Sequence, residues 1–228
     1  LGEIMKIKII IFCLFFIFIG CQKKQGSKEV SEKIISLEKE YAELRKLAIR
    51  EMYNGNWLKA IENFQKCLEL KPTDADIHFY LGVAYGNLIK LDKAYLEKSE
   101  NSYKIFLSLK PDAAEGYYGL AILYRYEYND IEKALEYINK SIECDKTYLK
   151  AYVAKGTFCY EAGLLKEAAE TYKKAIDLTQ AKEKKALYLK NLSKIYLKMG
   201  YPDEAEKYNK MSEKIYKQTP VKVRRKGK

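Results

Sequence analysis

A pattern that recurs at intervals of 34 to 39 residues is the feature that most limits how this chain can fold. Residues 56–72 resemble residues 130–146, 164–180 and 201–217. In the first three of these segments an alanine is followed four residues later by a large side chain, as Ala60 is by Phe64. A period of this length predicts repeated helical hairpins, because one hairpin buries its apolar edge only against a neighbour.

A second set of small residues lies ahead of these segments, each within another stretch of helical pattern. Its members are Ala48, Gly82, Ala121, Gly156 and Ser193. They are separated by 34, 39, 35 and 37 residues. We interpret the 39-residue unit as carrying a lengthened second helix or loop near residues 92–106. Pro72 and Pro111 stand where units end.

The residues resemble the tetratricopeptide repeat, whose pattern places Leu-Gly and a tyrosine in one helix and Ala, an aromatic residue and Pro in the next. Leu81-Gly82 with Tyr85 carries the first part, and Ala60, Phe64 and Pro72 carry the second. The resemblance covers five repeats within residues 37–217. It implies an all-α fold, a right-handed superhelical solenoid of helix-turn-helix repeats, with a concave groove that binds proteins or peptides.

Small residues are expected where the two helices of a repeat pack closely. The predicted packing positions are Ala48, Ala60, Gly82, Ala121, Ala134, Gly156, Ala168, Ser193 and Ala205. Gly55, Gly163 and Gly200 are expected to end the first helices, because glycine accepts left-handed backbone angles.

The start of the chain has the three parts of a secretory signal over residues 1–20, with translation expected to begin at Met5. Lys6 and Lys8 precede a short apolar segment, residues 9–19, which falls short of the ~20 residues that cross a bilayer. Gly20 followed by Cys21 resembles the lipobox of bacterial lipoproteins, which implies a covalent lipid on Cys21. An ordinary signal peptide and a signal anchor are the alternatives.

The two segments that flank the repeats are rich in charge. We interpret residues 21–36 as the lipidated cysteine and a flexible tether, and residues 218–228 as a basic disordered tail. The formal net charge of the chain is +11, and five basic residues lie among the last seven. The tail is either a solvated terminus or a contact with anionic lipids or polymers; nucleic acid is the least favoured partner.

The sequence offers no catalytic or metal-binding constellation, so we do not predict an enzyme. His78 is the only histidine, and a packing role is expected for it. Cys67, Cys144 and Cys159 are interpreted as small core residues, with a Cys144–Cys159 disulfide as the minor alternative. No metal and no cofactor besides the lipid on Cys21 are expected.

The resemblance assigns the partner-binding groove to one face of the first helices. The predicted groove residues are Arg45, Tyr53, Phe79, Asn87, Tyr118, Arg125, Tyr126, Tyr160, Lys190 and Lys194. Tyrosine and arginine are frequent in binding hot spots, but a tyrosine here can equally pack between helices. Lys190 and Lys194 form either a binding stripe or a solvated end face. Arg45 and Ile49 stand where the family's carboxylate clamp requires Lys and Asn, which argues against that kind of ligand.

These interpretations give two hypotheses of different classes. The first is a lipid-anchored scaffold of the bacterial cell envelope, periplasmic or surface-exposed, whose groove binds a protein or peptide partner during envelope assembly. The second is a surface-exposed lipoprotein or adhesin whose basic C-terminal end binds acidic polymers or host ligands. The sequence does not determine the oligomeric state.

Overall fold

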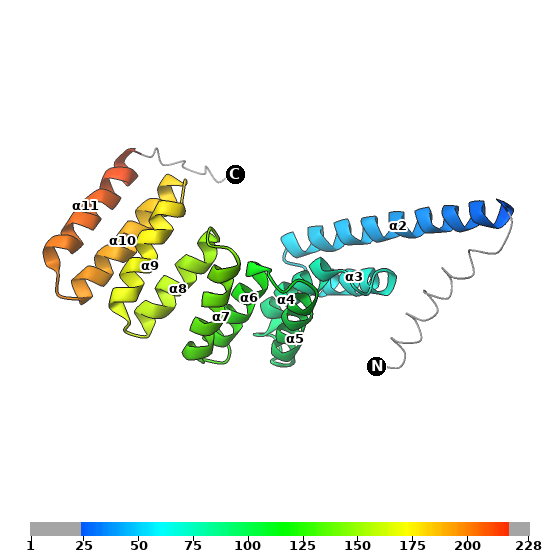
Figure 1. Ribbon diagram of the computed structural model, residues 1–228, viewed down its shortest axis with the longest axis horizontal. Coiled ribbons are helices and arrows are strands. Elements are labelled where there is room, and N and C mark those ends of the chain that lie inside the picture. The colour runs from blue at the N-terminus through cyan, green and yellow to red at the C-terminus, as the bar shows by residue number, and fades with distance from the viewer. Residues whose placement is uncertain (1–23, 219–228) are drawn as a thin grey trace, which may run out of the picture. The chain divides into compact units, whose positions relative to one another are not determined.

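The computed structural model describes residues 24–218, which form ten α-helices and no strand (Figure 1). The all-α fold of helical hairpins predicted from the repeats is confirmed. The helices belong to two compact units, one up to Thr73 and one from Asp74 onward. No helix between Lys24 and Gln218 is long and apolar enough to span a membrane. The predicted signal peptide, Cys21 and the tail from residue 219 lie outside the described residues.

The first unit is one hairpin of α2 (Lys24–Tyr53) and α3 (Trp57–Leu70). Gly55 ends the first helix with a φ of 77°, a conformation in which a side chain is strained. Ala48 and Ala60, two of the predicted packing residues, are fully buried in this hairpin. Lys71, which follows α3, contacts α2. Its Nζ forms an ion pair with Glu38 Oε2 at 2.6 Å and lies 4.3 Å from the centre of the Tyr41 ring.

The predicted flexible tether over residues 21–36 is wrong for its described part, because α2 is already helical from Lys24. No proline lies between Lys24 and Tyr53, and Gly26 is the only glycine in the helix. Extending a helix that is already packed adds one hydrogen bond per residue without a new nucleation step. The polar composition that suggested a tether is therefore compatible with a solvated helix, and residues 31–40 are indeed exposed.

The second unit contains four hairpins, and neighbouring hairpins are in contact. They are α4 (Ala75–Leu88) with α5 (Ala94–Leu109), α6 (Ala114–Tyr126) with α7 (Ile131–Cys144), α8 (Leu149–Glu161) with α9 (Leu165–Leu178), and α10 (Lys182–Lys198) with α11 (Pro202–Gln218). The core consists of clusters shared by successive hairpins: Phe158 of α8 packs with residues of α6 and α7. Stacking therefore buries the edge that each hairpin leaves open.

Most predicted packing residues of the second unit are buried. Ala121, Ala134 and Ala168 are fully buried, and Ala205 is buried. Gly82 faces the ring of Tyr103, and Gly156 faces that of Tyr172, so closely that an added Cβ would lie 2.8 Å from either ring. Ser193 differs, because it is only half-buried and its hydroxyl donates to the Ala205 carbonyl at 2.6 Å.

Serine side chains provide a second contact within three of the hairpins. Their hydroxyls donate at 2.7 Å to carbonyls of the preceding helix, in the pairs Ser99–Gly82, Ser141–Ala114 and Ser212–Ala186. All three serines are buried. A hydroxyl that finds an acceptor avoids the cost of an unsatisfied buried polar group, so each serine joins its two helices where an alanine would only fill space.

The unit of 39 residues is longer for two reasons. Residues 89–93 separate α4 from α5, whereas only residues 162–164 separate α8 from α9. In addition, α5 has 16 residues while α3, α7 and α9 each have 14. The predicted alternatives of a longer helix and a longer loop therefore both occur.

One of the three cysteines departs from its expected position. Cys67 and Cys159 are buried core residues, as predicted. Cys144 is exposed at the C-terminal end of α7, of which it is the last residue. All three thiols are free, so the alternative of a Cys144–Cys159 disulfide is also wrong.

Replacing Gly156 by alanine should destabilise the protein, although alanine is favoured over glycine in a helix by about 1 kcal/mol. The new Cβ would lie 2.8 Å from the buried Tyr172 ring, and overpacking of this kind costs about 1–3 kcal/mol. We expect a lower urea midpoint by circular dichroism. Gly86→Ala is the matched control, since its Cβ meets only the Ser99 hydroxyl, at 3.3 Å. Equal midpoints for the two variants would contradict close packing at Gly156.

Candidate partner-binding face

The first helices of the four hairpins in the second unit form a row. Helix α4 contacts α6, and α6 contacts α8. Helix α10 reaches α8 through Lys198, whose Nζ lies 4.7 Å from the centre of the Tyr160 ring. We call the side of this row that carries the predicted groove residues the inner face. Arg45 and Tyr53 lie instead on α2, in the first unit.

Arg125 of α6 joins two helices of the inner face. Its Nε donates to Glu161 Oε2 of α8 at 2.8 Å, and its Nη1 donates to Asn129 Oδ1 at 3.1 Å. The guanidinium also lies 5.4 Å from the centre of the Tyr126 ring. The Arg125 side chain is only 20% exposed, and its ion pair with Glu161 joins α6 to α8, so much of this guanidinium serves the contact between the two helices.

Two other predicted groove residues take part in aromatic packing. The Phe79 ring of α4 lies 5.3 Å from Phe106 and 6.0 Å from Tyr103, both on α5. Tyr118 of α6 meets Tyr148 edge-on at 5.8 Å, and burial raises the pKa of its phenol. Aromatic pairs at these distances stabilise helix contacts, so Phe79 helps to hold its own hairpin together and Tyr118 joins α6 to the start of α8.

The predicted residues that remain accessible are fewer. Tyr126 is 53% exposed and rests edge-on against the buried Phe158 at 6.0 Å. Asn87 is exposed at the end of α4, where its amide donates to the Val83 carbonyl at 2.8 Å. Tyr53 of α2 is 82% exposed, while Arg45 lines a shallow hollow on the same helix with Tyr41.

Helix α10 brings an excess of positive charge to the inner face. It contains six lysines and one glutamate. Lys190 and Lys194 are exposed, and no carboxylate of the described residues forms an ion pair with either. Lys198, one turn further, is held over Tyr160. The inner face therefore has a cationic end on α10, where Lys198 meets Tyr160 of α8.

A polar chain fixes α10 against its neighbours. The Tyr172 hydroxyl of α9 lies 2.9 Å from Thr157 Oγ1 of α8, and Asn191 of α10 donates to the same hydroxyl at 3.3 Å. Asn191 is adjacent to Lys190, so this chain sets the rotation of α10 about its axis. Lys190, Lys194 and Lys198 are spaced four residues apart and therefore lie along one side of the helix.

A buried carboxylate on α5 was not predicted from the sequence. Glu100 is 9% exposed and accepts from the Tyr124 hydroxyl at 2.8 Å and the Tyr128 hydroxyl at 2.5 Å. Lys104 forms an ion pair with it at 2.6 Å. Burial by itself raises the pKa of Glu100, but the hydrogen bonds from Lys104, Tyr128 and Tyr124 outweigh burial and leave that pKa below its usual value. Burial and the contact with Glu100 raise the pKa of Tyr128 to about 12.

One signal in the sequence pointed to this part of α5. Ser99 precedes Tyr103 by four residues, which is the spacing of Ala60 and Phe64 in the first repeat. That register places Ser99 against the preceding helix and makes Glu100 its neighbour at the edge of the core. The partners Tyr124 and Tyr128 lie in the next repeat, and no sequence spacing indicates them.

Metal binding finds no support in the described part of the chain, where no group of three His, Cys, Asp or Glu side chains is suitably placed. His78 lies half-buried on α4.

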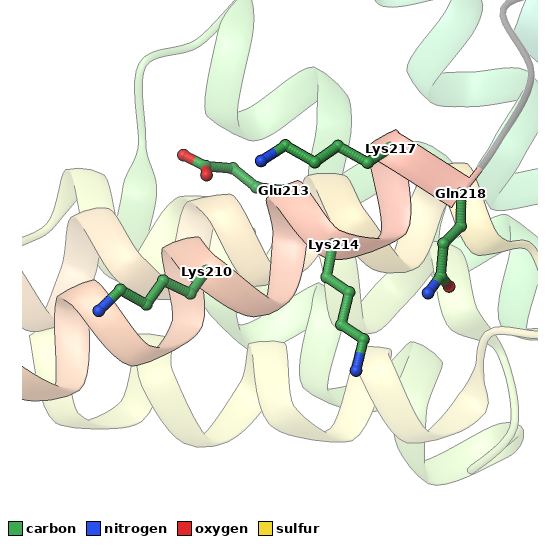
Figure 2. A pocket seen from close by; sticks show the side chains of 5 residues that line it. All are labelled: Lys210, Glu213, Lys214, Lys217 and Gln218. Atoms are coloured by element: carbon green, nitrogen blue, oxygen red, sulfur yellow. The ribbon is translucent and has the colours of Figure 1, made fainter.

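A shallow hollow over the last turns of α11 is lined by side chains of that helix alone (Figure 2). Its lining is Lys210, Glu213, Lys214, Lys217 and Gln218. Figure 2 shows Lys214 and Gln218 directed to one side of the helix and Glu213 and Lys217 to the other.

Known proteins share this pattern and fold. Residues 50–88 match a family model described as a TPR repeat, and residues 149–182 match one described as a tetratricopeptide repeat. A TPR repeat-containing protein of Borreliella burgdorferi is 28% identical over 169 residues, which are 71% of this chain and 73% of that protein.

Two solved structures show the same fold at low sequence identity. PilW, described as a widely conserved type IV pilus biogenesis factor, has a TM-score of 0.63 at 20% identity, with 78% of each chain covered. YrrB, described as a TPR protein with an unusual peptide-binding site, has a TM-score of 0.58 at 18% identity. That match covers 81% of this chain and 91% of YrrB.

Glu100→Gln should lower stability at neutral pH by about 1–3 kcal/mol, because Tyr124 and Tyr128 lose a charged acceptor. Since the folded-state pKa of Glu100 is depressed, its contribution is present above the unfolded-state pKa of ~4.3 and is lost as the pH falls through the folded-state value. Urea unfolding at pH 7 and near pH 3.5 should therefore show a difference from the parent that shrinks in acid. A difference of constant size would contradict a charged Glu100.

Proposed function

Because this chain is a tetratricopeptide-repeat protein, we propose that it is a lipid-anchored scaffold that binds a protein or peptide partner on the inner face of its repeats. The proposal makes it a binding protein and not an enzyme. The description of YrrB as a repeat protein with a peptide-binding site supports the proposal by analogy of fold.

The observation that carries the proposal is the cationic end of the inner face. Lys190 and Lys194 are exposed without a carboxylate partner among the described residues, while Tyr126 and Tyr160 offer aromatic surface on α6 and α8. A face that carries exposed ammonium groups at one end and exposed aromatic surface on neighbouring helices gains from a partner of opposite charge. We therefore expect the bound segment to be acidic where it meets α10, and to reach Tyr126 with an apolar or aromatic side chain.

The anchor is proposed from the N-terminal sequence alone. A lipid on Cys21, following the signal over residues 1–20, would hold the repeats at a membrane of the bacterial cell envelope, periplasmic or surface-exposed. The description of PilW as a pilus biogenesis factor is consistent with a role in envelope assembly.

A second candidate function is binding of acidic polymers or host ligands at the C-terminal end. The hollow on α11 favours it, because three of its five lining side chains are lysines. The basic residues of the tail would add to this surface, and each could contribute about 1 kcal/mol near an anionic membrane. Binding of this kind depends strongly on salt, whereas a partner held by Tyr126 keeps an apolar contribution.

Replacing Lys190 and Lys194 by glutamate should abolish partner binding without unfolding the protein, since both side chains are exposed. We would cross-link envelope proteins in intact cells that produce the parent or the variant, and identify the captured proteins by mass spectrometry. The expected result is at least one protein captured by the parent and absent from Lys190→Glu/Lys194→Glu.

The matched control is Lys166→Glu/Lys174→Glu, which makes the same change of charge at exposed positions on α9. A partner that this control retains and the α10 variant loses supports the inner face. Capture that is unaffected by the α10 variant but lost in Lys214→Glu/Lys217→Glu would favour the C-terminal surface instead.

The anchor has its own test. Cys21→Ala should move the protein from the membrane pellet to the supernatant after cell lysis and ultracentrifugation, because the diacylglyceryl and acyl chains would no longer be attached. Mass spectrometry of the parent should show a peptide that begins at a lipid-modified Cys21. An unmodified peptide that spans Gly20 and Cys21 would disprove lipidation.

A further inference from the structure

Helix α10 contacts α9 and α11 and leaves its remaining side exposed (Figure 1). The Ala186 carbonyl accepts from Ser212 of α11, and the Tyr188 ring lies 6.3 Å from that of Tyr172 on α9. Four large side chains lie on the exposed side, and we call them the α10 stripe. They are Leu187, Lys190, Lys194 and Leu197.

The α10 stripe is apolar at both ends and cationic in the middle. Its members follow one another at intervals of three, four and three residues, and side chains at this spacing lie along one face of a helix. Leu187 is 48% exposed and Leu197 is 64% exposed. Lys190 and Lys194, which lie between them, are exposed as well. A partner therefore meets two leucine side chains and two ammonium groups on one face.

The cationic middle of the stripe has no counter-charge within the described part of the chain. No carboxylate between residues 24 and 218 forms an ion pair with Lys190 or Lys194. Glu183, the only acidic residue of α10, lies seven residues before Lys190. Like charges four residues apart on a helix repel each other. Two carboxylates of a partner, placed at the same spacing, would relieve this repulsion.

We propose that the α10 stripe binds an amphipathic helix of the partner. The facing side chains of that helix are apolar, acidic, acidic and apolar, at intervals of three, four and three residues. This inference rests on the proposed function, which places an acidic part of the partner on α10. The intervals are the same when counted from either end, so the pattern fits a partner helix that runs in either direction along α10.

The length of the stripe favours a helix over an extended segment. Leu187 and Leu197 are ten residues apart, which is about 15 Å along a helix. A partner helix places four side chains over this length at the intervals of the stripe. An extended segment places a side chain on one face only about every 6.6 Å, so three would face α10. Its backbone N–H groups would also meet leucine and lysine side chains, which offer no acceptor, whereas a helix satisfies its own N–H groups.

Binding of designed peptides to the full chain in a mild detergent tests the inference. The probe is a fluorescein-labelled peptide of alanine and glutamine that carries leucine, glutamate, glutamate and leucine at the intervals of the α10 stripe. A second peptide has the same composition, but both glutamates lie on the opposite face of the helix. A third keeps the facing residues of the first and has a proline in the middle, which breaks a helix. Fluorescence anisotropy should show the first peptide binding at least tenfold more tightly than the other two.

The leucines of the stripe have a matched control. Leu187→Ala/Leu197→Ala should weaken binding of the first peptide at least tenfold, because the apolar ends of the stripe are lost. Its circular dichroism spectrum should equal that of the parent, since both leucines are exposed. Leu91→Ala/Leu109→Ala removes two exposed leucines from the hairpin of α4 and α5, away from α10, and should bind the peptide like the parent.

Cross-linking in intact cells separates this inference from the proposed function. Loss of the partner in both Lys190→Glu/Lys194→Glu and Leu187→Ala/Leu197→Ala supports the helix on the stripe. Loss in the lysine variant alone would overturn the helix and leave the proposed function intact. Retention in both variants would overturn the inference together with the proposed function at this face.

Three results with the peptides would also overturn the inference. They are a first peptide that does not bind the parent, equal affinities of the first and second peptides, and equal affinities of the first and third. Equal affinities of the first two would mean that charge alone is recognised, without the pattern of the stripe. Equal affinities of the first and third would assign the stripe to an extended ligand.

Discussion

The close approach of consecutive helices at small residues is the constraint on which the rest of the structure depends. Tyr103 of α5 shows it most clearly, because its ring lies between Gly82 of α4 and Gly119 of α6. A Cβ on either glycine would come within 2.8 Å of the ring. One aromatic side chain thus sets the distance within a hairpin and between two hairpins, and close-packed interiors leave little room to adjust it.

The candidate binding face is a consequence of this spacing. The fixed distance between α6 and α8 brings Arg125 to Glu161. The fixed distance between α8 and α10 places Lys198 over the Tyr160 ring. These contacts consume part of the polar surface that a ligand would otherwise use. What remains for a partner is the exposed ring of Tyr126 and the exposed ammonium groups of Lys190 and Lys194, with which no carboxylate between residues 24 and 218 forms an ion pair.

The same physics explains the first unit. A helix hairpin buries an apolar stripe only as far as its shorter helix reaches. Helix α3 has 14 residues and α2 has 30, so α3 does not cover the N-terminal part of α2. Past that point Ile34 and Leu37 continue the apolar spacing of α2, and they are 41% and 42% exposed.

The sequence by itself determined the repeat, the helical hairpins and most of their packing positions, because small residues at a fixed period serve close helix contacts within each repeat. Only the tertiary structure decided which groove residues are free to bind. Phe79 and Tyr118 match the pattern of a binding face as well as Tyr126 does, yet each packs against another aromatic ring. The partners of Glu100 lie 24 and 28 residues away, in the next repeat. Whether a side chain is exposed or occupied depends on the neighbouring hairpin, whose distance and rotation the pattern within one repeat does not contain.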